Sequence, residues 1–195
     1  MAIWVIGDVH GCGMELLYLI NRIKPTPQDK IVLVGDIFDR AHHPHIVWEL
    51  IHKYNIKCVL GNHDLKTLQY LTGTREDVPK HYHYALNLLA DNRACSTNEL
   101  VSFLQKLPLL IQIDDKIISH GGVDIQNPAV PNLSYNVYGA KKEDNVTIQK
   151  KNENNRSYWW DEYKENLRVV YGHFSCENNV PRIRKNPHGY INSVS

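Results

Sequence analysis

Long apolar runs and paired cysteines are both missing from this sequence. A membrane-spanning helix needs about 18 consecutive apolar residues, and no apolar run in this sequence approaches that length. The chain contains four cysteines, Cys12, Cys58, Cys95 and Cys176, and no two of them have the C-x-x-C spacing. These absences argue against a transmembrane protein, a disulfide framework and a cysteine-based zinc site.

An excess of charge of one sign is missing as well. The sequence has 22 Lys and Arg against 21 Asp and Glu, a formal net charge of +1. No global field therefore attracts nucleic acid or an anionic membrane. The first residues, MAIWVIGDVHG, carry no basic segment, and their apolar run is too short for a signal peptide. We expect a protein of the reducing cytoplasm that binds neither membranes nor nucleic acid.

Histidine is what the sequence has in abundance, with 11 residues in a composition that is otherwise ordinary. Hydrophobic residues make up 43% and charged residues 22%, as in soluble globular proteins. A chain of 195 residues is long enough for one domain with a substantial core or for two very small domains. We expect a single domain over residues 1–195.

Strand and helix patterns alternate in the first part of the chain. Buried-strand patterns cover 3–6, 30–34 and 57–60, and amphipathic helical patterns cover 14–23 and 45–54. This order predicts parallel pairing of the three strands and an α/β fold. Further along, the pattern predicts mostly helix over 63–107, a hairpin at 109–113 and 116–119, a polar irregular loop over 121–157, and strands at 168–171 and 188–194.

Metal-capable residues follow five of the predicted strands, at 3–6, 30–34, 57–60, 116–119 and 168–171. The strands are followed by GDVHG, GDIFDR, GNHD, HGG and GH, in that order. Ligands of open α/β sheets bind outside the carboxyl ends of the strands, so these segments are expected to converge. The predicted metal ligands are Asp8, His10, Asp36, Asn62, His120 and His173.

The donor set indicates which metals fit. Carboxylate, imidazole and amide donors without a thiolate suit transition metals better than calcium or magnesium. Six ligands are too many for one tetrahedral zinc ion, but they suit two ions about 3.5–4 Å apart that activate a water molecule. We predict two divalent transition-metal ions, manganese first, with iron, zinc, cobalt or nickel as alternatives.

The ordered motifs, spread over residues 7–173, resemble those of the metallophosphoesterases, and within them the phosphoprotein-phosphatase branch. Their detail is similar to the small bacterial and phage members, which include serine/threonine phosphatases and dinucleoside tetraphosphatases. The resemblance implies a four-layer αββα fold, a β-sandwich flanked by helices. It also implies that one ion takes Asp8, His10 and Asp36 and the other takes Asn62, His120 and His173, with Asp36 bridging both.

The resemblance also implies catalytic roles. His63 would protonate the leaving oxygen and Asp39 would hold its imidazole, in keeping with the need of a general acid for a pKa near neutrality. Arg40 would grip phosphate oxygens with its planar fork. Arg156 is a weaker second candidate for phosphate, because only an R-x-x-W-W match places it.

Three functions remain open on this sequence. The first, which we favour narrowly, is a protein serine/threonine phosphatase that acts on a phosphorylated protein through metal-activated water. The second is a bis(5'-nucleosyl)-tetraphosphatase, a hydrolase of diadenosine tetraphosphate. The third is a metal-binding interaction protein whose catalysis has decayed, although Asp39, Arg40 and His63 are all present.

Several features away from the motifs have two interpretations. His42, His43 and His45 could extend the metal site, but a polar loop leading into a helix is favoured. The aromatics Tyr158, Trp159 and Trp160 could stack on a base, but packing beside a strand is favoured. The family continues past a final I-D-T-G strand, whereas this chain stops at INSVS, so the last strands of one sheet are expected to be truncated. Residues 188–194 are then an edge strand, which either self-associates or frays.

Overall fold

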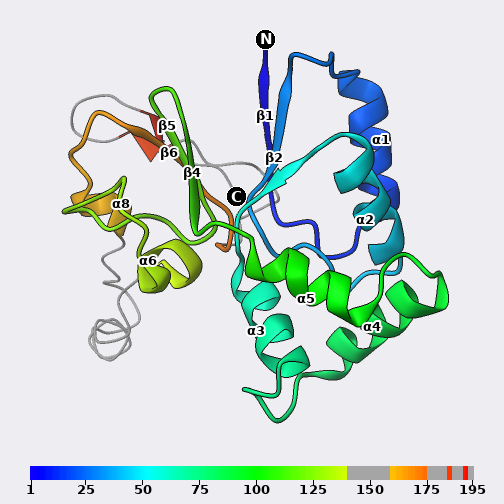
Figure 1. Cartoon of the computed structure of the whole chain (residues 1–195). Helices are drawn as coiled ribbons and strands as arrows, with labels where there is room; N and C mark the ends of the chain where they lie inside the picture. Colours follow the sequence, from blue (N-terminus) through cyan, green and yellow to red (C-terminus); the bar gives the residue numbers. More distant parts are fainter. Residues whose placement is uncertain (140–158, 175–183, 186–190, 193–195) are drawn as a thin grey trace. The chain divides into compact units, whose positions relative to one another are not determined.

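The computed structural model describes residues 1–139, 159–174, 184–185 and 191–192 (Figure 1). The chain divides into two compact units, Met1–Pro108 and Leu109–Ser195, which are called unit 1 and unit 2 below. Each has its own hydrophobic core. The expectation of one domain over residues 1–195 stays a prediction.

Unit 1 contains a three-stranded sheet in the order β1-β2-β3, formed by β1 (Ile3–Ile6), β2 (Lys30–Leu33) and β3 (Lys57–Cys58). All pairs are parallel, as predicted, with Ile6 opposite Leu33 and Leu33 opposite Cys58. Strand β3 is shorter than the apolar run 57–60. The N–H of Leu60 donates to the carbonyl of Pro108 and not to the sheet, so the chain leaves the ladder there.

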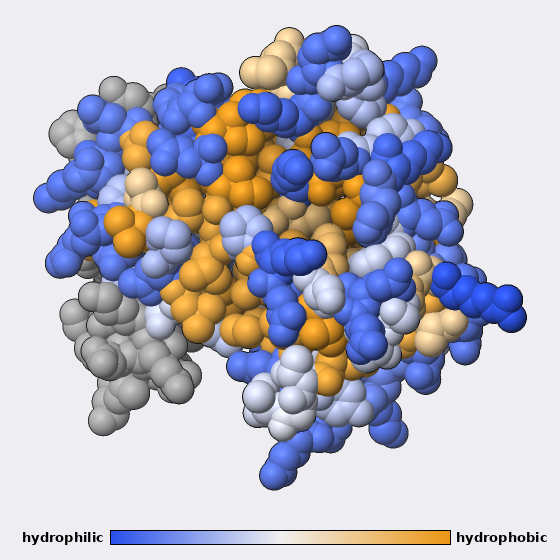
Figure 2. Space-filling view, in the orientation of Figure 1, coloured by the Kyte–Doolittle hydropathy of each residue, from blue (hydrophilic) through white to orange (hydrophobic). Residues whose placement is uncertain are grey.

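Helices α1 (Gly13–Ile23) and α2 (Pro44–Lys53) lie along one side of this sheet (Figure 1). Their apolar faces pack into the core of unit 1 through residues such as Leu16, Ile20 and Val47. The faces that point away from the sheet are mostly hydrophilic (Figure 2). Each helix thus buries one apolar face, as the 3.6-residue spacing of its apolar residues predicts.

The segment 63–107 is mostly helical, as predicted. It contains α3 (Asn62–Leu71), α4 (Lys80–Asp91) and α5 (Thr97–Gln105). Three residues separate the end of β3 from the start of α3, and the last of them, Gly61, is the N-cap of α3. The GNHD motif therefore forms the N-cap and the first turn of α3.

Unit 2 contains the predicted hairpin, β4 (Leu110–Ile113) and β5 (Lys116–Ser119), and β6 (Arg168–Val170) pairs parallel with β5. The predicted irregular loop is wrong over α6 (Leu133–Tyr138), where the side chain of Asn132 accepts the N–H of Ser134 and starts the helix. Helix α8 (Trp159–Glu162) places Trp159 and Trp160 in the core of unit 2, so the packing interpretation is confirmed for these two. Tyr158 lies outside the described residues.

A short antiparallel pair, β7 (Arg184–Lys185) and β8 (Ile191–Asn192), completes the described strands of unit 2. Strand β8 falls within the predicted 188–194, whereas β7 is not predicted by the pattern. The rest of 188–194 lies outside the described residues, so self-association through this strand stays a prediction. Within the parts of the chain that the structure describes, every helix is too short or too polar to cross a bilayer.

Candidate active site

The strand ends of unit 1 bring three motifs to one end of its sheet. Asp8 follows β1, Asp36 follows β2, and Asn62 opens α3 after β3. Since the three strands are parallel, all three residues lie beyond their carboxyl ends. Asp8 is exposed, whereas Asp36 and Asn62 are buried. Carboxylate oxygens of Asp8 and Asp36 lie within 4.8 Å of each other.

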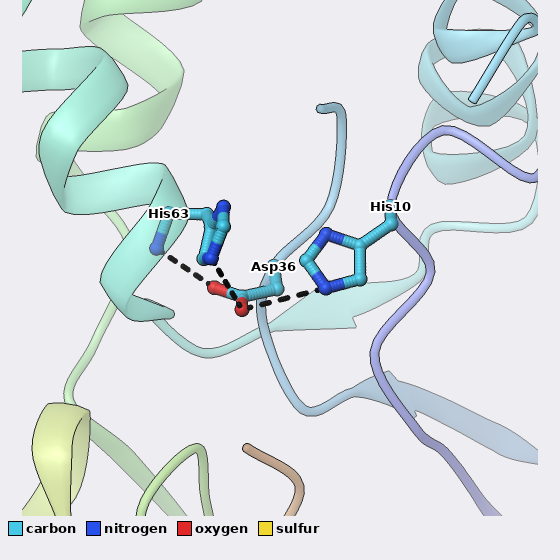
Figure 3. A group of neighbouring side chains, drawn as sticks. All are labelled: His10, Asp36 and His63. Atoms are coloured by element: carbon cyan, nitrogen blue, oxygen red, sulfur yellow. Dashed lines mark hydrogen bonds and ion pairs between the residues drawn. The ribbon is translucent and has the colours of Figure 1, made fainter. Parts of the chain in front are cut away.

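Two imidazoles face the Asp36 carboxylate (Figure 3). His10 Nε2 lies 3.7 Å and His63 Nε2 lies 4.0 Å from Asp36 Oδ2. The backbone N–H of His63 also donates to Asp36 Oδ1 at 2.9 Å. Burial raises the pKa of Asp36, and the nearby Asp64 carboxylate adds to this effect. Ionised Asp36 therefore needs a compensating positive charge close to its oxygens.

Asp39 holds both of these imidazoles. Its Oδ1 lies 2.7 Å from His10 Nδ1, and its Oδ2 lies 2.7 Å from His63 Nδ1. Burial would raise the pKa of Asp39, but hydrogen bonds from His10 and His63 outweigh it and hold the pKa well below its usual range. An ionised carboxylate only accepts hydrogen bonds, so both Nδ1 atoms carry the proton.

This tautomer gives His10 the properties of a metal ligand. With the proton on Nδ1, the neutral ring presents the lone pair of Nε2 towards Asp36 Oδ2. A lone pair opposite a carboxylate oxygen at 3.7 Å is favourable when a cation lies between them. A carboxylate that fixes the other ring nitrogen of a ligating histidine is the usual support of such a ligand.

His63 makes two further contacts. Arg40 Nη2 lies 3.1 Å from its Nε2 and donates to it, and the Tyr82 hydroxyl lies 2.8 Å from its Nδ1. The His63 and Tyr82 rings are stacked, with centroids 5.4 Å apart. Burial raises the pKa of Tyr82, so it stays a hydroxyl. Tyr82 lies on α4, outside all of the motifs in the sequence, and no local sequence pattern indicates that it contacts His63.

Asp64 is a second residue that the motif pattern did not single out. Its buried carboxylate accepts three backbone N–H groups, from Asp36 at 2.8 Å, Ile37 at 2.9 Å and Gly61 at 3.0 Å. These bonds tie the loop after β2 to the start of α3. The signal was available in the sequence, because an acidic residue at the third helical position commonly reaches back to the N-cap N–H.

Gly61 is expected to tolerate no side chain. A Cβ there would lie 2.2 Å from Asp36 Oδ1 and 2.3 Å from the Asp36 backbone nitrogen. We expect Gly61→Ala to lower the free energy of unfolding by about 1–3 kcal/mol, as overpacking does, and to weaken metal binding because Asp36 must move. Chemical denaturation and metal titration measure the two effects.

Gly7 supplies the matched control for this prediction. It lies in the equivalent position after β1, and a Cβ there would meet nothing within 4 Å. Gly7→Ala should therefore leave stability and metal binding nearly unchanged. Equal effects of the two substitutions would contradict the close approach of Gly61 to Asp36.

The backbone at the site is itself unusual. In unit 1, His10, Asp36 and Arg40 have φ values of 47°, 50° and 78°, in the left-handed region that non-glycine residues seldom adopt. Around the first two, the N–H groups of Val9 and His10 donate to the carbonyl of Asp36. Such conformations cost of order 1–3 kcal/mol each and collect at functional sites, where the surrounding structure maintains them.

Unit 2 brings the remaining two predicted ligands together. His120 follows β5 and His173 lies just beyond β6, and these strands are parallel. The Gly172 N–H donates to the His120 carbonyl at 2.9 Å, and His120 Nε2 lies 3.1 Å from His173 Nδ1. The side chain of His120 is fully buried. Two imidazole nitrogens this close together can bind one ion as a pair of ligands.

Two predictions away from the strand ends have different outcomes. His42 Nδ1 lies 2.7 Å from the Tyr84 hydroxyl, and His43 is the N-cap of α2, which agrees with a polar loop that leads into a helix. Arg156 lies outside the described residues, so its role stays a prediction.

The fold and these motifs identify the class of protein. Residues 1–190 match the family model described as calcineurin-like phosphoesterase, so the chain belongs to that family of hydrolases. The predicted metallophosphoesterase fold is also found in a solved structure provisionally named a diadenosine tetraphosphatase. The TM-score is 0.67 at 22% identity, over 92% of this chain and 79% of the other.

Curated relatives carry a more specific name. The symmetrical bis(5'-nucleosyl)-tetraphosphatase of Shigella dysenteriae serotype 1 is 35% identical over 132 residues, which are 65% of this chain and 45% of that protein. The enzyme of the same name from Haemophilus ducreyi is 36% identical over 128 residues, 63% of this chain and 46% of that protein. The alignments thus cover a little under half the length of these relatives.

Proposed function

We propose that this protein is a dinuclear metal-dependent hydrolase that cleaves dinucleoside tetraphosphates symmetrically. The observation that carries the chemistry is His63, held by Asp39 beside the buried carboxylate of Asp36 in a calcineurin-like phosphoesterase. The curated relatives support the substrate, because they are named symmetrical bis(5'-nucleosyl)-tetraphosphatases. They favour this substrate over the phosphoprotein that we expected first from the motifs.

The donor chemistry fits two transition-metal ions. The proposed ligands supply carboxylate, imidazole and amide donors, and the buried Asp36 carboxylate needs a positive charge near its oxygens. When bound, two divalent ions would activate water and neutralise charge on the phosphate. Manganese is our first choice. The residues proposed to hold the ions are Asp8, His10, Asp36, Asn62, His120 and His173.

The other residues of the site serve phosphate binding and proton transfer. We assign to Arg40 the binding of phosphoryl oxygens, since its side chain is half exposed and its guanidinium lies next to His63. His63 would deliver a proton to the leaving oxygen through Nε2, while Asp39 stabilises its imidazolium through Nδ1. Arg40 donates to Nε2 in this structure, so it must turn towards the phosphate before Nε2 can carry that proton.

Arg40→Ala is expected to weaken phosphate binding as well as turnover. The loss of the guanidinium removes a charge-assisted contact worth about 1.5–3 kcal/mol, so the inhibition constant of inorganic phosphate should rise roughly 10- to 100-fold. Competitive inhibition assays measure it. Arg75→Ala is the control, because Arg75 donates to the carbonyl of Asp77 on the exposed surface. If phosphate inhibits Arg40→Ala as well as the parent, Arg40 has been assigned wrongly.

A substrate panel tests the proposed function. The purified chain, supplied with Mn²⁺ and separately treated with a chelator, is incubated with diadenosine tetraphosphate, phosphopeptides and an aryl phosphate. Release of two ADP molecules per diadenosine tetraphosphate, at a higher kcat/KM than for phosphopeptides, is the expected result. Faster turnover of phosphoserine or phosphothreonine peptides would support a protein phosphatase. No metal-dependent turnover of any substrate would support a decayed enzyme.

A further inference from the structure

A second group of metal-capable side chains in unit 1 combines the catalytic residues Asp39 and His63 with His81. Asp39 Oδ2 lies 2.7 Å from His63 Nδ1 and 3.4 Å from His81 Nε2. One ligand atom from each of these three residues lies within 4.8 Å of the other two. His81 is the second residue of α4, and none of the sequence motifs includes it. None of the six proposed ligands of the two catalytic ions belongs to this group.

The Nε2 atom of His81 lacks a hydrogen bond. The atom is shielded from solvent, yet it finds no hydrogen-bond partner among the residues that the structure describes. The side chain as a whole is 38% exposed, so the ring can be reached from solvent while this nitrogen faces Asp39. A shielded nitrogen without a partner is rare in native proteins. Burial lowers the pKa of His81, which favours the neutral ring with a lone pair to donate.

We propose that Asp39, His63 and His81 form a third metal site that takes Zn²⁺ and inhibits the enzyme. Zinc binds imidazole and carboxylate at about 2.0–2.2 Å, and three protein ligands with a water in the fourth position are a common zinc set. Tetrahedral ligands at that distance lie roughly 3.4 Å apart. The separation of Asp39 Oδ2 from His81 Nε2, 3.4 Å, already matches this value. His63 Nδ1, which lies 2.7 Å from Asp39 Oδ2, needs to move away from it by roughly 0.7 Å.

The inhibitory effect rests on the proposed function of His63. Zinc at Nδ1 takes the lone pair that otherwise holds a proton, so that proton moves to Nε2 and the hydrogen bond to Asp39 is replaced by coordination. The ring then carries its proton on Nε2 but has lost the carboxylate that supports its imidazolium. Arg40 can no longer donate to Nε2. Zinc would therefore prevent His63 from cycling as an acid without removing the two catalytic ions.

A zinc titration of the manganese-saturated protein tests the site. Bound zinc and manganese per chain are measured by mass spectrometry after free metal has been removed, and turnover is measured in parallel. We expect one zinc per chain to bind without release of manganese, while turnover falls. His81→Ala should keep its basal turnover, and its dissociation constant for zinc should rise at least about tenfold. His81→Gln, which keeps a polar side chain, should behave in the same way.

His83→Ala is the matched control, because His83 lies on the same helix and its Nε2 contacts the exposed Asp77 at 3.3 Å. It should bind zinc as the parent does. Equal zinc binding by His81→Ala and the parent would overturn the site, as would one-for-one replacement of manganese by zinc in all the proteins. Binding that depends on His81 but leaves turnover unchanged would overturn the inhibitory role. The binding measurement needs no substrate, so a failure of the proposed function is recognised separately.

Discussion

Asp36→Asn is expected to lose metal and turnover together. The resemblance gives Asp36 the bridging position, and its carboxylate is buried among His10, His63 and Asp64. A neutral amide keeps the shape but cannot bridge two cations. Metal ions contribute several kcal/mol to such reactions, so turnover should fall roughly a thousandfold or more. Metal content after reconstitution and the rate of hydrolysis are measured on the same sample.

The stability of the metal-free proteins shows whether Asp36→Asn acts on the site and not on folding. Burial raises the pKa of Asp36, so the folded metal-free protein keeps a proton that the unfolded chain releases. Its stability should then decrease as the pH rises above the ordinary carboxyl range of about 4, whereas Asp36→Asn should lack this decrease. Asp77→Asn, at an exposed carboxylate, should retain the metals and turnover. An Asp36→Asn protein with two metals and full turnover would refute the bridging assignment.

His63→Asn is expected to keep its metals and to lose the general acid. His63 bonds Asp39, Arg40 and Tyr82 and is not assigned as a ligand. The value of kcat should fall by roughly 10²–10⁴ for substrates with a poor leaving group. The loss should be much smaller for an aryl phosphate, whose leaving oxygen needs little protonation. Steady-state kinetics on both substrates, with metal content determined alongside, give the comparison.

His52→Asn is the control for this experiment. His52 lies on α2, where its Nδ1 bonds the carbonyl of Trp48, away from the strand ends that carry the motifs. It should change neither metal content nor the ratio of the two rates. Equal losses for both substrates in His63→Asn would contradict its role as the acid, and loss of metal would instead make His63 a ligand.

The sequence by itself determined the order of the elements and the position of the motifs. Three apolar runs separated by amphipathic helices predict a parallel sheet, and β1, β2 and β3 form it. The sequence shows where each strand ends, and the connecting helices determine that the strands pair in parallel. Asp8, Asp36 and Asn62, which follow these strands, therefore lie at the same end of the sheet. His120 and His173 also follow two predicted strands, but there the structure and not the sequence supplied the parallel pairing, of β5 with β6.

Only the tertiary structure decided which side chains support these groups. Asp39 was expected to hold His63, but the packing also places it 2.7 Å from His10. Tyr82 contacts His63 and His81 contacts Asp39, and both residues lie on α4. The hydrophobic period of α4 predicts which face of the helix is buried, but it does not predict which motif residues that helix contacts. Contacts between residues distant in sequence depend on how helices pack, and a local pattern carries no record of that geometry. The order of the motifs thus came from the sequence, and the hydrogen-bonded surroundings of His63 from the fold.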